Sequence, residues 1–216
     1  MALIHRTTLK PAKVDLLAGW LPTRPWYHGP AAPELAKAGG FRLDDPEGEV
    51  GIEFMVVTAG PDAYLVPLTY RAAPLDGAGH ALLGTMEHGV LGTRWAYDGC
   101  HDPVLTAGLA ALVEGRAAAQ AQSLTDTPDR EVARAYTGAD RLPGLGVPLD
   151  TDESTEFAVA GGGVVLRLRR VLVPGSQPPA DARGHVTGAW RQPDGTRVRG
   201  LFAEVGSDGS RGGRTG

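Results

Sequence analysis

The chain has 216 residues, of which 42% are hydrophobic, and this balance is ordinary for a folded protein with one large core or two small ones. With 21 Lys and Arg residues against 25 Asp and Glu, the formal net charge is only −4, and no basic run is interleaved with aromatic residues, which argues against nucleic-acid binding. The single cysteine, Cys100, excludes an internal disulfide and fits a reducing compartment.

The absence of membrane and signal segments and the distribution of glycine and proline indicate the class of protein. No apolar run approaches membrane-spanning length, and the first residues lack the apolar block of a signal peptide, so we expect a cytoplasmic protein without a membrane partner. Glycine and proline are above average and cluster between short apolar segments. This pattern is typical of a strand-rich chain with many turns.

The first forty residues predict a short strand and one helix. Residues 3–9 alternate apolar and polar side chains, as a half-buried strand does. Pro11 suits a helix start and Pro22 a helix end, because proline lacks the amide hydrogen that a helix interior needs. Val14 and Leu17 fall on one face of this helix, and we expect that face to be buried.

Residues 40–72 predict an antiparallel meander of three strands. Turn residues at 45–48 and 60–62 separate three segments that alternate in polarity. In the middle segment the even-numbered residues from Val50 to Val56 are all apolar and share one side. That side is the expected core face of the sheet.

A second helix is predicted to begin after Asp102. Residues 81–99 continue the sheet as one or two further strands interrupted by a glycine. Asp102 can accept amide hydrogens of the first helical turn, and Pro103 loses no hydrogen bond at the first helical position. The alanine-rich stretch that follows favours helix, so we expect the helix to extend over residues 104–122.

The C-terminal part predicts a linker and two β-hairpins. Residues 131–138 are consistent with a strand, whereas residues 141–154 are rich in proline, glycine and acidic residues and are expected to form a linker. Residues 155–205 predict two hairpins, which either complete the first sheet or form a separate unit. The expected domains are therefore 1–140, the hairpin region 155–205, and a polar, disordered tail at 206–216.

Several blocks between Met1 and Gln122 occur in a familiar order: HRTTL…LLAGWLPTRPWYHG, GGFRLDDPEGEVGIEFMVV, YLVPLTYRAAPL and EHGVLGTRWAYDGCHDPV. In this order they resemble the N-terminal cap domain of maltokinases, enzymes that transfer phosphate from ATP to maltose. The resemblance implies an α+β fold in which a helix packs on a curved antiparallel sheet, as in cystatins, followed here by a small β-hairpin region. It also implies a place in α-glucan metabolism, where glycogen, trehalose and maltose 1-phosphate are handled.

A weaker resemblance concerns catalysis. FAVAGGGVVLRLRRVLVPG is similar to the first hairpin of the maltokinase ATP-binding lobe, and Arg167 or Arg169 stands where a lysine would meet the nucleotide phosphates. The glycines at 161–163 lack the spacing of a phosphate-covering loop, which favours a plain hairpin turn. None of the six histidines is followed two positions later by the aspartate of a kinase catalytic loop. We therefore predict a non-catalytic chain, with no catalytic residue and no cofactor.

Residues 84–103 gather the side chains Glu87, His88, Asp98, Cys100, His101 and Asp102. Zinc sites need spacings such as C-x-x-C or H-E-x-x-H, which do not occur, and neighbouring Cys and His side chains at a turn point apart. We therefore predict no metal site here, although an enzyme of another type that uses this cluster is kept as an alternative. The acidic run at 150–153 lacks the glycine and distal glutamate of an EF-hand, which favours a solvated linker over a cation site.

The candidate ligand-binding residues are Trp26, Tyr27, His28, Arg94, Arg167 and Arg169. Sugars stack on flat apolar rings, while charged groups bind their hydroxyls, and the two aromatic residues lie in a proline-rich loop. The alternative is that the aromatic rings are part of the core. Two functions stay open: an interaction or regulatory module for an α-glucan or trehalose pathway enzyme, and a small binding module for an oligosaccharide or a nucleotide.

Overall fold

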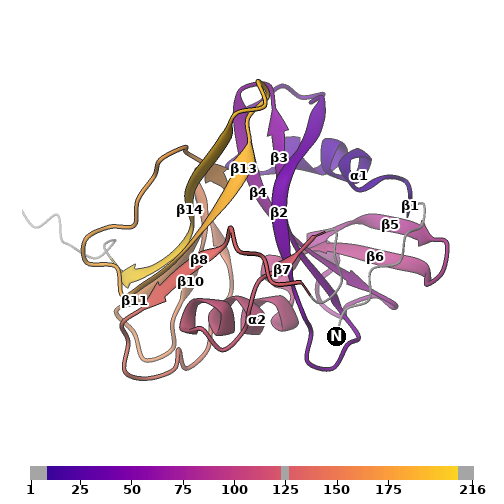
Figure 1. The fold of residues 1–216 in the computed structure, drawn as a ribbon. Coiled ribbons are helices and arrows are strands. Elements are labelled where there is room, and N and C mark those ends of the chain that lie inside the picture. The colour runs from indigo at the N-terminus through magenta and orange to yellow at the C-terminus, as the bar shows by residue number, and fades with distance from the viewer. Residues whose placement is uncertain (1–8, 123–126, 209–216) are drawn as a thin grey trace, which may run out of the picture.

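The computed structural model describes residues 9–122 and 127–208, which form one antiparallel sheet of fourteen strands and two α-helices (Figure 1). The helices are α1 (Lys13–Trp20) and α2 (Pro103–Glu114). The strands are β1 (Leu9–Lys10), β2 (Leu35–Leu43), β3 (Gly51–Ala59), β4 (Asp62–Arg71), β5 (Leu82–His88), β6 (Gly92–Asp98), β7 (Gln120–Ala121), β8 (Ala133–Tyr136), β9 (Leu149–Asp150), β10 (Ser154–Ala158), β11 (Val164–Arg169), β12 (Val171–Leu172), β13 (Gly184–Arg191) and β14 (Arg197–Ser207). The fold is thus mostly antiparallel sheet with two short helices, while the cystatin-like arrangement stays a prediction.

The predicted meander is confirmed as β2, β3 and β4, which pair in sequence order at the centre of the sheet. The predicted extension at residues 81–99 consists of two strands, β5 and β6, which continue the sheet from β4. On the other side of β2, the order continues through β13, β14, β11, β10 and β9 (Figure 1). The two predicted C-terminal hairpins, β10–β11 and β13–β14, are therefore joined directly to the meander.

At Arg170 the chain passes from the C-terminal strands back to β4, a central strand of the sheet. Strand β11 pairs with β14, but β12, which follows a single residue later, pairs with β4 through Val171 opposite Tyr64. The amide of Leu65 donates to the carbonyl of Arg170 at 2.9 Å. The chain on both sides of residues 141–154 thus shares one sheet, and the division into separate domains stays a prediction.

Two apolar clusters cover the two sides of the central strands. The even-numbered side of β3, including Phe54, packs with α2 and with side chains of the C-terminal strands such as Trp190 and Phe202, which confirms the predicted core face. The odd-numbered side of β3 is buried too, because Leu17 and Trp20 of α1 pack against it. Both faces of the centre of the sheet are therefore shielded from water.

Helix α2 begins as predicted but ends early. The Asp102 carboxylate accepts a hydrogen bond of 3.0 Å from the Val104 amide, which is the expected N-cap interaction. The prediction of helix through residue 122 is wrong, because Gly115 adopts a left-handed conformation with φ of 81° and closes the helix. The residues that follow pair with the free edge of β2 as β7, a long-range contact that outweighs the helical propensity of alanine.

The two ends of the chain are only partly described. The strand predicted at residues 3–9 lies almost wholly outside the described residues, which start with β1. Strand β14 includes Gly206 and Ser207, the first residues of the predicted tail, because they pair with β11; residues 209–216 lie outside the description. Within residues 9–122 and 127–208, the helices are too short or too polar for a membrane span.

Candidate functional site

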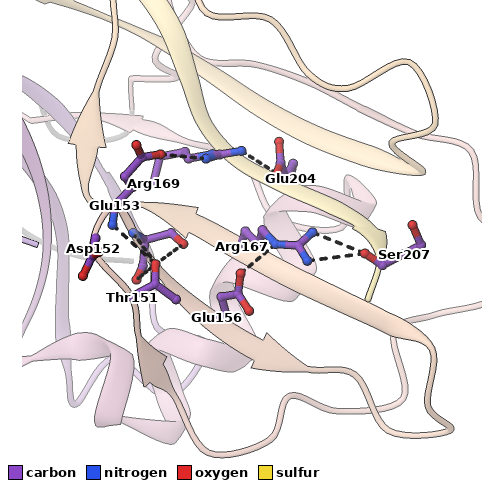
Figure 2. Close-up of a pocket in the computed structure, with 9 residues that line it drawn as sticks. Thr151, Asp152, Glu153, Glu156, Arg167, Arg169, Glu204 and Ser207 are labelled. Carbon is purple, nitrogen blue, oxygen red and sulfur yellow. Dashed lines mark hydrogen bonds and ion pairs between the residues drawn. The ribbon is translucent and has the colours of Figure 1, made fainter. Parts of the chain in front are cut away.

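A polar groove of about 660 Å³ lies over β10, β11 and the end of β14 (Figure 2). Its lining consists of hydroxyl and charged side chains: Thr151, Asp152, Glu153, Ser154, Glu156, Arg167, Arg169, Glu204 and Ser207. Two of the predicted ligand-binding residues, Arg167 and Arg169, therefore lie together in one groove. They do so because residues two apart in a strand point to the same side of the sheet.

Strand register places Arg167 directly between two carboxylates. It lies opposite Glu156 of β10 and opposite Glu204 of β14. The Arg167 Nε donates to Glu156 Oε1 at 2.7 Å, and both terminal nitrogens lie 3.4 Å from the carbonyl oxygen of Ser207. Figure 2 shows the Arg167 guanidinium between the Glu156 carboxylate and the Ser207 carbonyl. Its position is therefore fixed by three adjacent strands.

Arg169 is paired with carboxylates as well. A terminal nitrogen donates to Glu204 Oε1 at 2.6 Å, and the other lies 3.8 Å from Glu153 Oε2 (Figure 2). The Glu204 side chain is only 3% exposed, so this pair is largely desolvated. One atom of each partner, Glu204 Oε2 and Arg169 Nε, is buried with no hydrogen-bond partner.

The groove as a whole is acidic. It contains four carboxylates, from Asp152, Glu153, Glu156 and Glu204, against two guanidinium groups. Since each guanidinium already pairs with a carboxylate, an incoming phosphate would meet uncompensated negative charge. The arrangement therefore does not favour a nucleotide, and it does favour ligands that donate hydrogen bonds.

The other predicted ligand-binding residues lie elsewhere. Trp26 is fully buried, with its ring centroid 5.8 Å from that of Trp20, and Tyr27 is almost fully buried, with its ring 5.1 Å from that of Tyr64. These core contacts match the alternative that the rings belong to the core, and neither residue lines the groove. Arg94 lies on β6, also outside the groove, and its Nε is buried with no partner.

His28 is exposed and borders the groove without lining it. Its Nε2 lies 3.1 Å from the carbonyl oxygen of Asp152, a residue of the groove wall. The contact joins the loop after α1 to the loop before β10, which are 124 residues apart in the chain. His28 therefore contacts the groove wall from outside, at Asp152.

The cluster at residues 84–103 is occupied by structural contacts. Glu87 accepts a hydrogen bond from Thr93 at 2.6 Å, and His88 accepts from the amides of the turn that follows it. Burial raises the pKa of the Cys100 thiol well above its ordinary value, which opposes formation of a nucleophilic thiolate. Over the described part of the chain, no three His, Cys, Asp or Glu side chains converge as a metal site would require.

The sequence interpretation missed Arg170, which is fully buried beneath the groove strands. It donates to both Asp98 oxygens, at 2.9 and 2.6 Å, and to Thr155 Oγ1 at 2.7 Å, and it lies 4.9 Å from the centre of the Trp26 ring. Arg170 directly follows the last residue of β11, Arg169, and continuing the alternation of that strand by one residue predicts an inward side chain. This alternation was the one signal in the sequence that could have indicated a buried Arg170.

A histidine pair lies beside this buried cluster and predicts a pH-dependent stability. His80 Nε2 is 3.0 Å from His101 Nδ1. Burial lowers the pKa of His101, as do His80 and Arg170, while Asp98 and Asp150 oppose the decrease. Because the unfolded chain, with a histidine pKa of about 6.5, binds this proton first, the stabilisation is complete above that pH and decreases below it.

We therefore expect a lower melting temperature at pH 5.5 than at pH 7.5, measured by thermal denaturation. In a His101→Gln variant the difference between the two pH values should shrink. An unchanged difference would show that other groups cause it. Ordinary carboxylates titrate at about pH 4, below this window.

Comparison with known proteins identifies one segment. A family model described as the maltokinase N-terminal cap domain matches residues 20–102. The match extends from the end of α1 to the N-cap of α2 and includes the meander and the β5–β6 hairpin, so this segment is a maltokinase-cap-like domain. No curated protein gave a match to the chain. The polar groove, at residues 151–207, lies outside the matched segment.

Proposed function

We propose that this chain is a non-catalytic, cap-like protein of the cytoplasm that binds an enzyme of α-glucan or trehalose metabolism and regulates it. The observation that carries the proposal is the cap-like segment at residues 20–102, because the maltokinase cap family is associated with maltose and trehalose metabolism. The fold alone does not give the activity, so the non-catalytic role needs separate support.

The charge pairing of the C-terminal strands supports the non-catalytic part of the proposal. Arg167 and Arg169, the residues that resemble the phosphate-binding lysine of a kinase, are paired with Glu156 and Glu204. A guanidinium held in this way is not available to couple ATP phosphates to a catalytic centre. The nucleotide-binding alternative is weakened by the same pairing.

The turn between β5 and β6 supports the interaction part of the proposal. Val90 and Leu91 at this turn are 62% and 44% exposed, and both lie within the cap-like segment. Exposed apolar side chains that lie together can form the apolar centre of a contact surface. We propose this turn as the part of the cap that contacts the partner enzyme.

A pull-down with the purified chain tests this function. We expect a cytoplasmic extract of the native host to yield an enzyme of α-glucan or trehalose metabolism, identified by mass spectrometry, and the purified enzyme to bind again. Val90→Ser with Leu91→Ser should reduce this binding at least tenfold. The matched control is Val147→Ser with Leu149→Ser, two exposed apolar residues outside the cap segment.

The contrary outcomes are distinct. Equal loss of binding in both double variants would indicate unspecific apolar adhesion and would contradict a role for the β5–β6 turn. Recovery of no enzyme of this metabolism, with the chain folded by circular dichroism, would contradict the proposed partner class.

A further inference from the structure

Two side chains that line the groove over β10, β11 and β14 each carry one buried polar atom that the protein leaves without a partner. Glu204 Oε2 and Arg169 Nε are both buried and without a partner. The other oxygen of Glu204, Oε1, accepts a hydrogen bond of 2.6 Å from a terminal nitrogen of Arg169. A buried polar group without a partner is unfavourable, and native proteins rarely retain one. Glu204 is almost fully buried and lines the groove, so a ligand bound there could supply the hydrogen bond that its Oε2 lacks.

The chemistry of the two atoms restricts the ligand class. A carboxylate oxygen needs a donor, a guanidinium N–H needs an acceptor, and a hydroxyl group is both. A phosphate only accepts and would face the four carboxylates of the groove, while an amine cation only donates and would leave the Arg169 N–H without an acceptor. A neutral ligand with several hydroxyl groups satisfies both atoms without a charge penalty.

Further polar groups surround this pair at fixed positions. Thr151 Oγ1 lies 2.9 Å from Ser154 Oγ, so one hydroxyl of the groove wall orients the other. Arg167 is anchored between Glu156 and the Ser207 carbonyl. Because most of these groups belong to paired strands, the groove is pre-organised and does not need to order itself on binding.

We propose that this groove is a binding site for a neutral polyhydroxylated ligand of the di- or oligosaccharide class, with Glu204 and Arg169 as its central contacts. No aromatic ring lines the described groove, so binding relies on hydrogen bonds rather than on ring stacking. The site is independent of the β5–β6 turn and of any partner enzyme.

Titration of the ¹⁵N-labelled full chain, followed by NMR, tests the proposal. The probes are maltotriose as a neutral saccharide, ATP as an anion and spermidine as a cation. We expect saturable shifts of the amides of residues 151–156 and 204–207 with maltotriose only. Glu204→Gln should weaken this binding at least tenfold, because it removes the charge from the central acceptor.

Two further variants keep the test conclusive. Glu131→Gln is the matched control, since Glu131 also pairs with an arginine, Arg197, but lies outside the groove; its maltotriose affinity should be unchanged. If Glu204→Gln does not fold, Glu153→Gln serves instead, because Glu153 is exposed and lines the groove; we expect severalfold weaker binding.

Three outcomes would overturn the proposal: saturable shifts in the groove with ATP or spermidine but not with maltotriose, maltotriose shifts confined to other residues, or no shifts with any probe. None of them affects the enzyme-binding function, which is tested at Val90 and Leu91. Conversely, a failed pull-down would leave this binding site standing.

Discussion

Replacing Arg170 with methionine should lower the free energy of unfolding by about 3–5 kcal/mol, because it leaves a buried carboxylate without its counter-charge. Arg170 and Asp98 are both fully buried and 2.6 Å apart. Burial alone would lower the pKa of Arg170, but Asp98 raises it above the ordinary value, so the guanidinium keeps its charge. Urea denaturation followed by tryptophan fluorescence measures the loss.

The matched control for this prediction is Arg167→Met, on β11, the strand that ends just before Arg170. The ion pair between Arg167 and Glu156 is partly exposed, with side chains 20% and 25% accessible, so we expect a loss below about 1 kcal/mol. Combining Arg170→Met with Asp98→Leu should recover part of the stability, since neither buried charge is then left alone. Similar losses for Arg170→Met and Arg167→Met would refute a special role for the buried pair.

An Asp102→Ala variant should lose about 2–4 kcal/mol, because this carboxylate has two structural roles. It caps α2 through the Val104 amide, and both its oxygens accept hydrogen bonds of 2.7 Å from Arg71 on β4. The side chain is fully buried, so water cannot replace either partner. Circular dichroism should show fraying of the first turn of α2 together with a lower urea midpoint.

Two comparisons separate the roles of Asp102. Asp102→Asn retains a capping oxygen but removes the charge that pairs with Arg71, so we expect an intermediate loss. Asp76→Ala, at an exposed position, should change stability by no more than about 0.5 kcal/mol. A full loss in Asp102→Asn would mean that the ion pair alone accounts for the effect, and the capping role would be discarded.

Elements set by neighbouring residues could be predicted from the sequence. The start of α2 depends on Asp102 and Pro103, and the strands of the meander depend on alternation and turn residues within about thirty positions. The end of α2 depended instead on the competing pairing of β7 with β2, between residues almost eighty positions apart. No local pattern reports such a contact, so the alanine-rich sequence suggested helix.

In the candidate site, too, features that depend on neighbouring residues could be predicted from the sequence, and features that depend on long-range contacts could not. Alternation correctly indicates that Arg167 and Arg169 share one side of a strand, but Glu204, on a strand that pairs with them, could not be placed without the sheet order. Trp26 and Tyr27 do lie in a loop, but the sequence does not show that Tyr64 packs against both and that they are buried. Arg170 escaped notice because a buried arginine is rare and its partner Asp98 is 72 positions away.

The return of the sheet at Arg170 makes the two halves of the protein interdependent. Aromatic side chains of the last strands, such as Trp190 and Phe202, cover the side of the meander that includes Phe41 and Phe54. An apolar side of the cap-like segment in this chain is therefore covered by β13 and β14, which lie outside the matched residues 20–102. Changes in the C-terminal strands should alter the abundance of the folded protein even where they leave every residue of the cap untouched.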